Sequence, residues 1–184
     1  MTRANPTLET ERLNFRMLRA SDFPIYETWC ANIDVMRYIG GKTLDRIMAW
    51  RNLSNLVGHW GLLGYGYYAV EEKATGRFIG RVGFTNQPGW PGFELGWTIA
   101  PECQGKGYAT EAARMLLPYA FDRLDQAHVI SLIHKDNHPS RRVAEKLGET
   151  IEGEATIADN TYLVYGISRP LTGDGVPRRR SVTP

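Results

Sequence analysis

The chain has 184 residues, of which 42% are hydrophobic and 23% are charged. The length suits one domain of ordinary size with a core of its own, and the composition excludes wholesale disorder. Lys and Arg number 22 against 20 Asp and Glu, but residues 171–184, with three Arg and one Asp, hold the whole excess. Residues 1–170 are therefore neutral overall and give no sign of the basic face of a nucleic-acid-binding domain.

The cysteines and the apolar runs exclude further classes of protein. Cys30 and Cys103 allow at most one disulfide, and neither belongs to a Cys–His spacing typical of structural zinc. No stretch approaches the about 18 continuous apolar residues of a membrane span, and residues 1–12 lack the apolar segment of a signal peptide. We expect a cytoplasmic protein that binds no nucleic acid, membrane or metal, with residues 1–170 as one domain and residues 171–184 as a flexible basic tail.

The first half of the chain predicts a strand followed by two helices. Residues 13–17 alternate apolar and polar side chains, which is typical of a half-buried strand. Ser21 and Asp22 supply capping side chains for a helix that would run to about residue 32. After a Gly-Gly break, apolar residues at mostly helical spacing predict a second helix from about Leu44.

The middle of the chain predicts consecutive strands. Residues 67–72 and 77–84 form a hairpin around the turn at 74–76, and a third strand occupies 93–99 after the loop at 86–92. Because the connections are too short for crossover helices, we expect these strands to be antiparallel.

The second half returns to a helical period. Apolar residues recur at i, i+3, i+4 and i+7 from Tyr108 to Leu124, which predicts an amphipathic helix. The elements expected after it are a strand at 128–134, a helix at 137–148, and strands near 150–156 and 161–168. Grouped strands followed by alternating helices and strands indicate a mixed α/β domain of the α+β type.

Residues 100–112 (APECQGKGYATEA) form the segment most suggestive of chemistry. Gly105 and Gly107 leave backbone N–H groups unshielded just before the unpaired first turn of the helix, an arrangement that binds anions such as a pyrophosphate. A P-loop is excluded because Ala100 stands where its first glycine would be. The Gly-x-Gly-x-x-Ala run at 64–69 precedes a strand instead of opening a helix, so it is not a Rossmann fingerprint.

The remaining pattern, Gln104-x-x-Gly107-x-Ala109, resembles the motif with which the GNAT superfamily of N-acetyltransferases binds the pyrophosphate of acetyl-CoA. Downstream, Asn137-x-x-Ser140 followed by VAEKLG resembles the second CoA-side motif of that family. The order of the predicted elements agrees with that of the family over nearly the whole chain. The residues of the second motif are most similar to those of the branch of ribosomal-protein N-terminal acetyltransferases. The resemblance implies a mostly antiparallel sheet of about seven strands, splayed in the middle to admit CoA.

The same resemblance implies where acetyl-CoA binds. It lies in the gap between the strands at 93–99 and 128–134, with the pantetheine on the backbone and the pyrophosphate on the amides of the glycine loop. The implied cofactor-binding residues are Thr98, Ile99, Gln104, Gly105, Lys106, Gly107, Tyr108, Ala109, Thr110, Asn137 and Ser140.

For catalysis, the resemblance implies direct attack of a primary amine on the thioester, which needs a base and an acid. Glu94 is the expected base, acting through an ordered water. Ala144 occupies the position where many members carry an acidic tyrosine, so Ser140 is the expected acid.

Several alternatives stay open on the sequence. The absent tyrosine would also suit a non-catalytic acyl-CoA-binding module or sensor, and the anion site would suit a nucleotide-binding regulator. His134 and His138 are four residues apart, yet ordinary surface histidines are preferred to a metal site. The amine acceptor is not readable from the residues, and the resemblance allows a homodimer.

Overall fold

The computed structural model describes residues 8–170. The strands of this part of the chain are β1 (Leu8–Glu9), β2 (Leu13–Met17), β3 (Tyr67–Glu72), β4 (Phe78–Thr85), β5 (Glu94–Ile99), β6 (His128–His134), β7 (Thr150–Ile157) and β8 (Asn160–Ser168). The α-helices are α1 (Phe23–Cys30), α2 (Ile33–Met36), α3 (Arg46–Leu63), α4 (Tyr108–Asp122) and α5 (His138–Leu147), and two 3-10 turns are η1 (Ala20–Asp22) and η2 (Pro101–Cys103). None of the helices within residues 8–170 is long and apolar enough to cross a membrane.

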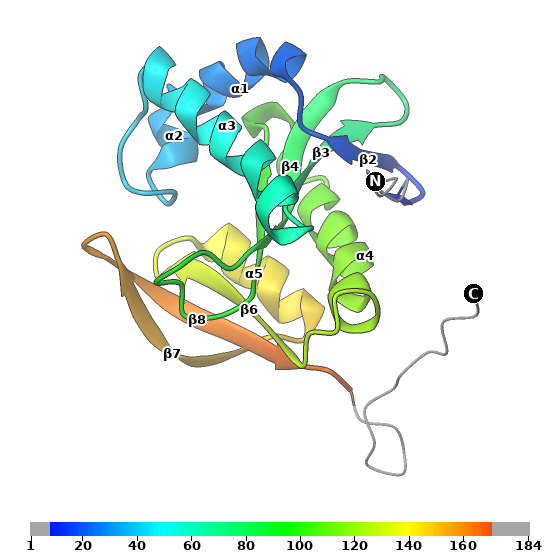
Figure 1. Ribbon diagram of the computed structural model, residues 1–184, viewed down its shortest axis with the longest axis vertical. Helices are drawn as coiled ribbons and strands as arrows, with labels where there is room; N and C mark the ends of the chain where they lie inside the picture. Colours follow the sequence, from blue (N-terminus) through cyan, green and yellow to red (C-terminus); the bar gives the residue numbers. More distant parts are fainter. Residues whose placement is uncertain (1–7, 171–184) are drawn as a thin grey trace.

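The strands form one sheet in the order β1-β2-β3-β4-β5-β6-β8-β7 (Figure 1). Neighbours are antiparallel except for β5 and β6, which are parallel and are in register only at Glu94 and Ile130. The Ile130 amide donates to the Phe93 carbonyl at 2.9 Å, so the two strands are joined at the start of β5. Beyond that point they separate, which confirms the expected mixed, mostly antiparallel sheet that is splayed in the middle.

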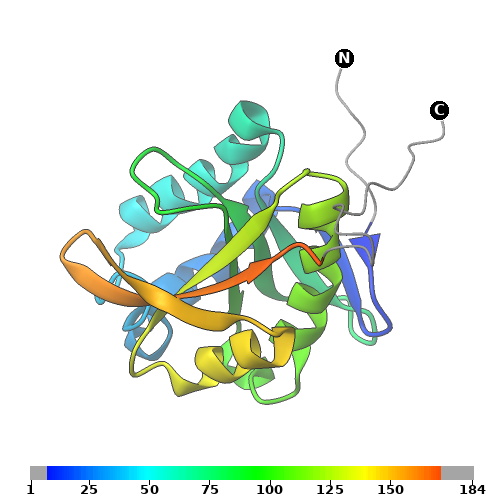
Figure 2. The same cartoon turned by 90° about the horizontal axis from the view of Figure 1, so that it is seen from below.

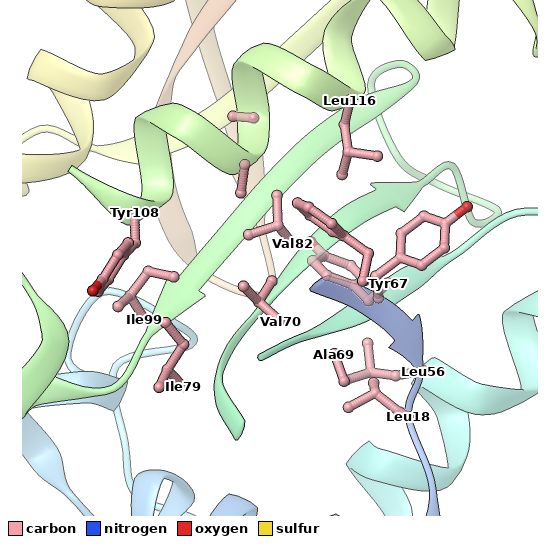
Figure 3. Close-up of a cluster of buried hydrophobic side chains, with 14 of the residues drawn as sticks. Leu18, Leu56, Tyr67, Ala69, Val70, Ile79, Val82, Ile99, Tyr108 and Leu116 are labelled. Atoms are coloured by element: carbon pink, nitrogen blue, oxygen red, sulfur yellow. The ribbon is translucent and has the colours of Figure 1, made fainter. Parts of the chain in front are cut away.

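Helices cover both faces of this sheet. In Figure 3, Leu116 of α4 points toward Val82 of β4, whereas Ala69 of β3 lies with Leu18 and Leu56 on the other side. Leu116, Val82 and Ala69 are fully buried. Figure 2 shows the layers from below, with α1 and α3 on the face opposite α4.

Alternation along β4 decides which residues reach each helical layer. Phe84 stacks on Tyr119 of α4, with ring centroids 6.5 Å apart, so Val82 and Phe84 pack toward α4. Arg81 and Thr85 therefore point to the opposite face, which is covered by α1 and α3. The candidate site is built on this second face.

The structure confirms the predicted elements with small shifts at their ends and two differences. The sheet has eight strands within residues 8–170, because β1 adds a short edge strand. The first predicted helix ends near residue 32 as expected, but a further short helix, α2, follows it and begins at Asn32, whose side chain accepts the Asp34 amide at 2.9 Å.

The expectation that Asp22 caps α1 through its side chain is wrong. Its carboxylate accepts hydrogen bonds from the Arg16 guanidinium at 2.7 Å and from the Arg19 amide at 2.9 Å instead. The basic tail predicted at 171–184 lies outside the described residues.

Candidate active site

The loop before α4 has the backbone conformation of an anion-binding turn. Gly105 and Gly107 have φ angles of 75° and 84°, a left-handed region that side chains rarely adopt. Gly107 is the N-cap of α4. In the part of the chain that the structure describes, no hydrogen bond occupies the amides of residues 105–110. Several donors at the positive end of a helix dipole are thus available to one anion.

Arg12, from the loop between β1 and β2, fastens this turn to the sheet. Its guanidinium donates to the Lys106 carbonyl at 3.1 Å and to the Glu111 carboxylate at 2.7 Å, and it lies 4.6 Å from the centre of the Tyr108 ring. Burial acts to raise the pKa of Glu111, but hydrogen bonds from Thr10 and Arg12 outweigh it, so this pKa is lowered. The negative charge of Glu111 in the first turn of α4 is therefore neutralised by Arg12.

A cavity of about 390 Å³, here called the loop cavity, extends from this turn along the end of β5 to α5. Nine of the predicted cofactor-binding residues line it: Thr98, Ile99, Gln104, Gly105, Gly107, Tyr108, Ala109, Asn137 and Ser140. Lys106 and Thr110 do not. Lys106 contributes its carbonyl to Arg12, and its side chain is exposed.

Two cations in the loop cavity were missed by the sequence reasoning. Arg142 and Lys146 are four residues apart on α5 and both line the cavity opposite the glycine turn. Their i, i+4 spacing within the predicted helix was the available signal, because it places both on one face. They add positive charge to a site whose other donors are backbone amides.

The side chains of Gln104 and Asn137 form hydrogen bonds with backbone groups of the protein. The Gln104 side-chain amide donates to the Ile99 carbonyl at 3.0 Å and so holds the turn against the end of β5. The Asn137 side chain accepts the Ser140 amide at 3.2 Å and caps α5. Both residues position the walls of the loop cavity.

A second and larger cavity of about 700 Å³, here called the sheet cavity, lies between the sheet and α3. Its walls include Tyr26 of α1, Asn52 and His59 of α3, Tyr67 of β3, Arg81 of β4 and Glu94 of β5. The residues that line both cavities are Tyr38, Ile39, Trp97, Thr98, Asn137 and Ser140. The two cavities thus meet beside β5, where β5 and β6 separate.

Glu94 is a buried carboxyl group in the wall of the sheet cavity. It is 8% exposed, and one of its oxygens accepts a hydrogen bond from the Trp90 indole at 2.6 Å. Burial raises the pKa of Glu94 to about 7, against lowering contributions from Trp90, the Leu132 amide and Arg81. A pKa near neutrality suits a group that accepts a proton at physiological pH.

Tyr67 and Arg81 form a stacked pair beside Glu94. The Tyr67 hydroxyl passes so close to Gly96 that a Cβ there would lie 2.1 Å from it, so a larger residue at position 96 would displace the Tyr67 ring. The Arg81 guanidinium carbon lies 4.4 Å from the centre of the Tyr67 ring. Burial raises the pKa of Tyr67, and its hydroxyl stays protonated.

Two hydroxyl groups lie where the cavities meet. Ser140 accepts a hydrogen bond from the Trp97 indole at 3.3 Å. Tyr38, which the sequence reasoning missed, lines both cavities and lies 5.4 Å from the His134 ring between centroids. Ala144 is fully buried with Ile133 and Tyr165, so that position belongs to the core.

Comparisons with known proteins identify the family of the chain. Residues 12–150 match the family model described as "Acetyltransferase (GNAT) domain". An uncharacterized N-acetyltransferase of Bacillus subtilis, YnaD, is 39% identical over 148 residues, which cover 79% of this chain and 84% of that protein. A crystal structure of an acetyltransferase from Agrobacterium tumefaciens matches with a TM-score of 0.82 and 33% identity, covering 91% of this chain and 96% of the other.

The fold also extends to more distant structures. Mycobacterium smegmatis RimJ in complex with CoA-disulfide superposes with a TM-score of 0.70 at 18% identity, covering 91% of this chain and 85% of that one. The family model spans most of the described residues and both CoA-side motifs. The chain therefore belongs to the GNAT family of N-acetyltransferases.

Proposed function

We propose that the chain transfers an acetyl group from acetyl-CoA directly to a primary amine, within one complex of enzyme and both substrates. The observation that carries this proposal is the meeting of the two cavities beside β5. One has an anion-binding turn at its far end, and the other has a buried carboxyl group with a pKa of about 7. The first suits a CoA pyrophosphate and the second an amine that must lose a proton.

Support for acetyl-CoA in the loop cavity comes from charge and backbone geometry. The amides of Gly105 to Thr110 are donors without protein partners among the described residues, and Arg142 and Lys146 add two cations. RimJ, a structural relative, is described in complex with CoA-disulfide. Bound acetyl-CoA would supply the thioester, and the residues of this chain would hold it and move the protons.

In this proposal Glu94 accepts the proton of the amine through a water molecule. Trp90 holds the carboxylate, and the neutral amine attacks the thioester carbon. A C–N bond forms, the C–S bond breaks, and the departing sulfur takes a proton. The nitrogen of the tetrahedral intermediate must lose a further proton to become an amide. We propose that Ser140, positioned by Trp97 where the cavities meet, gives its hydroxyl proton to the sulfur and regains one from that nitrogen, so that it relays the proton.

The proposal is tested by calorimetry with acetyl-CoA, followed by detection of free thiol with a panel of amines. We expect binding of acetyl-CoA and thiol release that depends on an added amine. Binding without thiol release for any amine would indicate an acyl-CoA-binding module instead. Competition by ATP that equals competition by CoA would indicate a nucleotide site.

A further inference from the structure

Arg81 is a cation in the wall of the sheet cavity without a carboxylate partner. Among the described residues, no Asp or Glu oxygen lies within ion-pairing distance of it. Arg16 shows the usual arrangement for a partly buried guanidinium, because it pairs with Asp22 at 2.7 Å and with Glu71 at 2.6 Å. An unpaired charge in such a setting is costly to the fold, which suggests a partner that arrives from outside.

The neighbours of Arg81 leave its hydrogen-bond donors without a negative charge to bind. Its guanidinium lies against the face of the Tyr67 ring, and the hydroxyl groups of Tyr26 and Tyr67 are its neutral hydrogen-bonding partners. Glu94 is the carboxyl group whose charge Arg81 influences, but the two are not in contact as an ion pair. A guanidinium presents a planar fork of N–H groups that matches a carboxylate.

The place of Arg81 in the sheet brings it within reach of the reacting groups. Arg81 is in register with Thr98, which lines both cavities, and Thr85 is in register with Glu94. Thr98 and Glu94 are four residues apart on the same face of β5, a separation of about 13 Å along the strand. That spacing is between backbone positions. The Arg81 guanidinium lies on the Tyr67 ring, whose hydroxyl reaches Gly96. Arg81 and Glu94 therefore flank Tyr67 on one wall of the sheet cavity.

A second polar group of the cavity wall lacks a protein partner. His59 of α3 is 6% exposed and lines the sheet cavity, and its Nδ1 has no hydrogen-bond partner among the described residues. The Nδ1 atom itself is closed to solvent, so it is an unsatisfied buried group beside the cavity and not a contact to its contents. His59 and Arg81 come from different elements and both line this one cavity.

From this arrangement we infer that the amine acceptor carries a carboxylate, which Arg81 binds while Glu94 faces the amine end. The acceptor is then a small amino acid. Its carboxylate is complementary to Arg81, and its ammonium group, before deprotonation, is complementary to ionised Glu94. This inference rests on the proposed function and names its substrate class. It disfavours polyamines, because their additional positive charge would lie near the unpaired guanidinium.

The test compares acceptors that differ only in the carboxylate. Thiol release from acetyl-CoA is measured with unbranched amino acids whose amine and carboxylate are separated by methylene chains of increasing length, with their methyl esters and with spermidine. We expect the best amino acid to exceed its own ester by at least about tenfold in kcat/KM, because an unpaired Arg81 penalises the ester. The optimum chain length reports the distance between the carboxylate site and the amine site.

The second part of the test substitutes Arg81. Arg81→Gln should lower kcat/KM for the amino acid at least about tenfold, mainly through KM, and leave the ester within about threefold. Arg81→Lys should restore part of the preference, since it keeps the charge but loses the planar fork. Arg51→Gln is the matched control, because Arg51 is exposed on α3 and forms no ion pair among the described residues. Circular dichroism and thermal unfolding confirm that each variant is folded.

The outcomes separate this inference from the proposed function. If esters or simple alkylamines are acetylated as well as amino acids, and Arg81→Gln changes nothing, the acceptor inference is overturned while the transfer reaction stands. A peptide with an N-terminal Asp and an amidated C-terminus that exceeds every free amino acid would overturn the small-acceptor part. If no amine releases thiol, calorimetry of the amino acids against the CoA complex decides: no binding, or binding that Arg81→Gln leaves unchanged, refutes the site.

Discussion

The loop cavity and the sheet cavity meet beside β5, yet they are built from different chemical parts. The loop cavity offers mainly backbone amides from one short segment, residues 104–110, with two cations added by α5. The sheet cavity offers side chains from α1, α3, β3, β4 and β5, which are far apart in the sequence. A site made from backbone amides suits a ligand shared by many proteins, whereas a site made from side chains can select one acceptor.

The first prediction concerns the anion-binding turn of the loop cavity. Gly107→Glu places a carboxylate at the anion-binding turn and a side chain at a φ of 84°. We expect affinity for acetyl-CoA to fall by about 1000-fold, because several charge-assisted hydrogen bonds are lost and a like charge is added. Calorimetry measures this directly.

Gly64→Glu is the matched control for that substitution. Gly64 is exposed at the end of α3 with a φ of 75°, and a Cβ there would meet nothing within 4 Å. It carries the same change of charge and a similar backbone conformation, so it should bind acetyl-CoA normally. A folded Gly107→Glu variant with normal affinity would show that the phosphate turn lies elsewhere.

The second prediction concerns Glu94, the proposed base in the sheet cavity. Glu94→Gln should lower kcat/KM by about 100-fold while acetyl-CoA binding is unchanged. Because the pKa of Glu94 is about 7, kcat/KM of the unmodified protein should rise with pH up to a plateau above about 7. The acceptor chosen for this profile must have an amine that is neutral across the range.

Glu149 supplies an internal control for Glu94. It is 3% exposed, and burial raises its pKa to about 7 as well, but it does not line either cavity. Glu149→Gln should therefore leave kcat/KM at the plateau within about threefold. Because the charges of Glu149 and Glu94 repel each other, the pH profile should move slightly to lower pH and keep its shape. Equal losses of activity in the two variants would remove Glu94 from its proposed role.

Both carboxyl groups should also affect stability in the same direction. Each binds its proton more tightly in the folded state than in the unfolded state, so stability falls as pH rises from about 4.5 through about 7. Each Gln variant should therefore be more stable than the unmodified protein above pH 7, by at most about 3 kcal/mol. Urea unfolding at several pH values measures the difference.

The third prediction concerns the proton donor at the junction of the cavities. Ser140→Ala should lower kcat by about tenfold, less than the about 100-fold or more of a typical acid–base group, because a serine hydroxyl is a weak acid. The cap of α5 should survive, because Asn137 binds the amide of residue 140 and not its hydroxyl. Tyr38→Phe is the informative partner variant, and a larger loss there than in Ser140→Ala would transfer the acid role to Tyr38.

The last prediction compares the effects of two arginine substitutions on stability. Arg16→Met leaves the buried Asp22 with only the Arg19 amide and a longer ion pair to Arg19 at 3.7 Å, and should cost about 3 kcal/mol in the free energy of unfolding. Arg81→Met removes a cation without a carboxylate partner and should cost less than about 1 kcal/mol. Similar losses in the two variants would mean that Arg81 has a structural partner.

The difference between the cavities also explains what could be predicted from the sequence. The turn at Gly105 and Gly107 and the cap at Asn137 are contiguous patterns with local physical causes, and the structure places them in one cavity. The strands and α4 followed from apolar periodicity, with ends shifted by one or two residues. These features depend on neighbours in the chain.

The features that could not be predicted from the sequence depend on contacts between distant segments of the chain. In the sequence, Asp22 is a plausible cap for the first helix, but in the structure its carboxylate binds the Arg16 guanidinium instead. Nothing local at Arg81 or His59 distinguishes them from surface residues, because their place in the sheet cavity depends on the register of β4 and the packing of α3. The proposed acceptor site could therefore be inferred only from the folded chain.

The most direct test of the central claim is a single-turnover experiment with acetyl-CoA labelled in the acetyl group. Protein mass and free thiol are followed with and without an amine acceptor. Direct transfer within the two joined cavities predicts no thiol release and no acetylated protein until the amine is added, followed by one labelled amide per thiol. A labelled protein intermediate, or bound acetyl-CoA that never releases thiol with any amine, would contradict it.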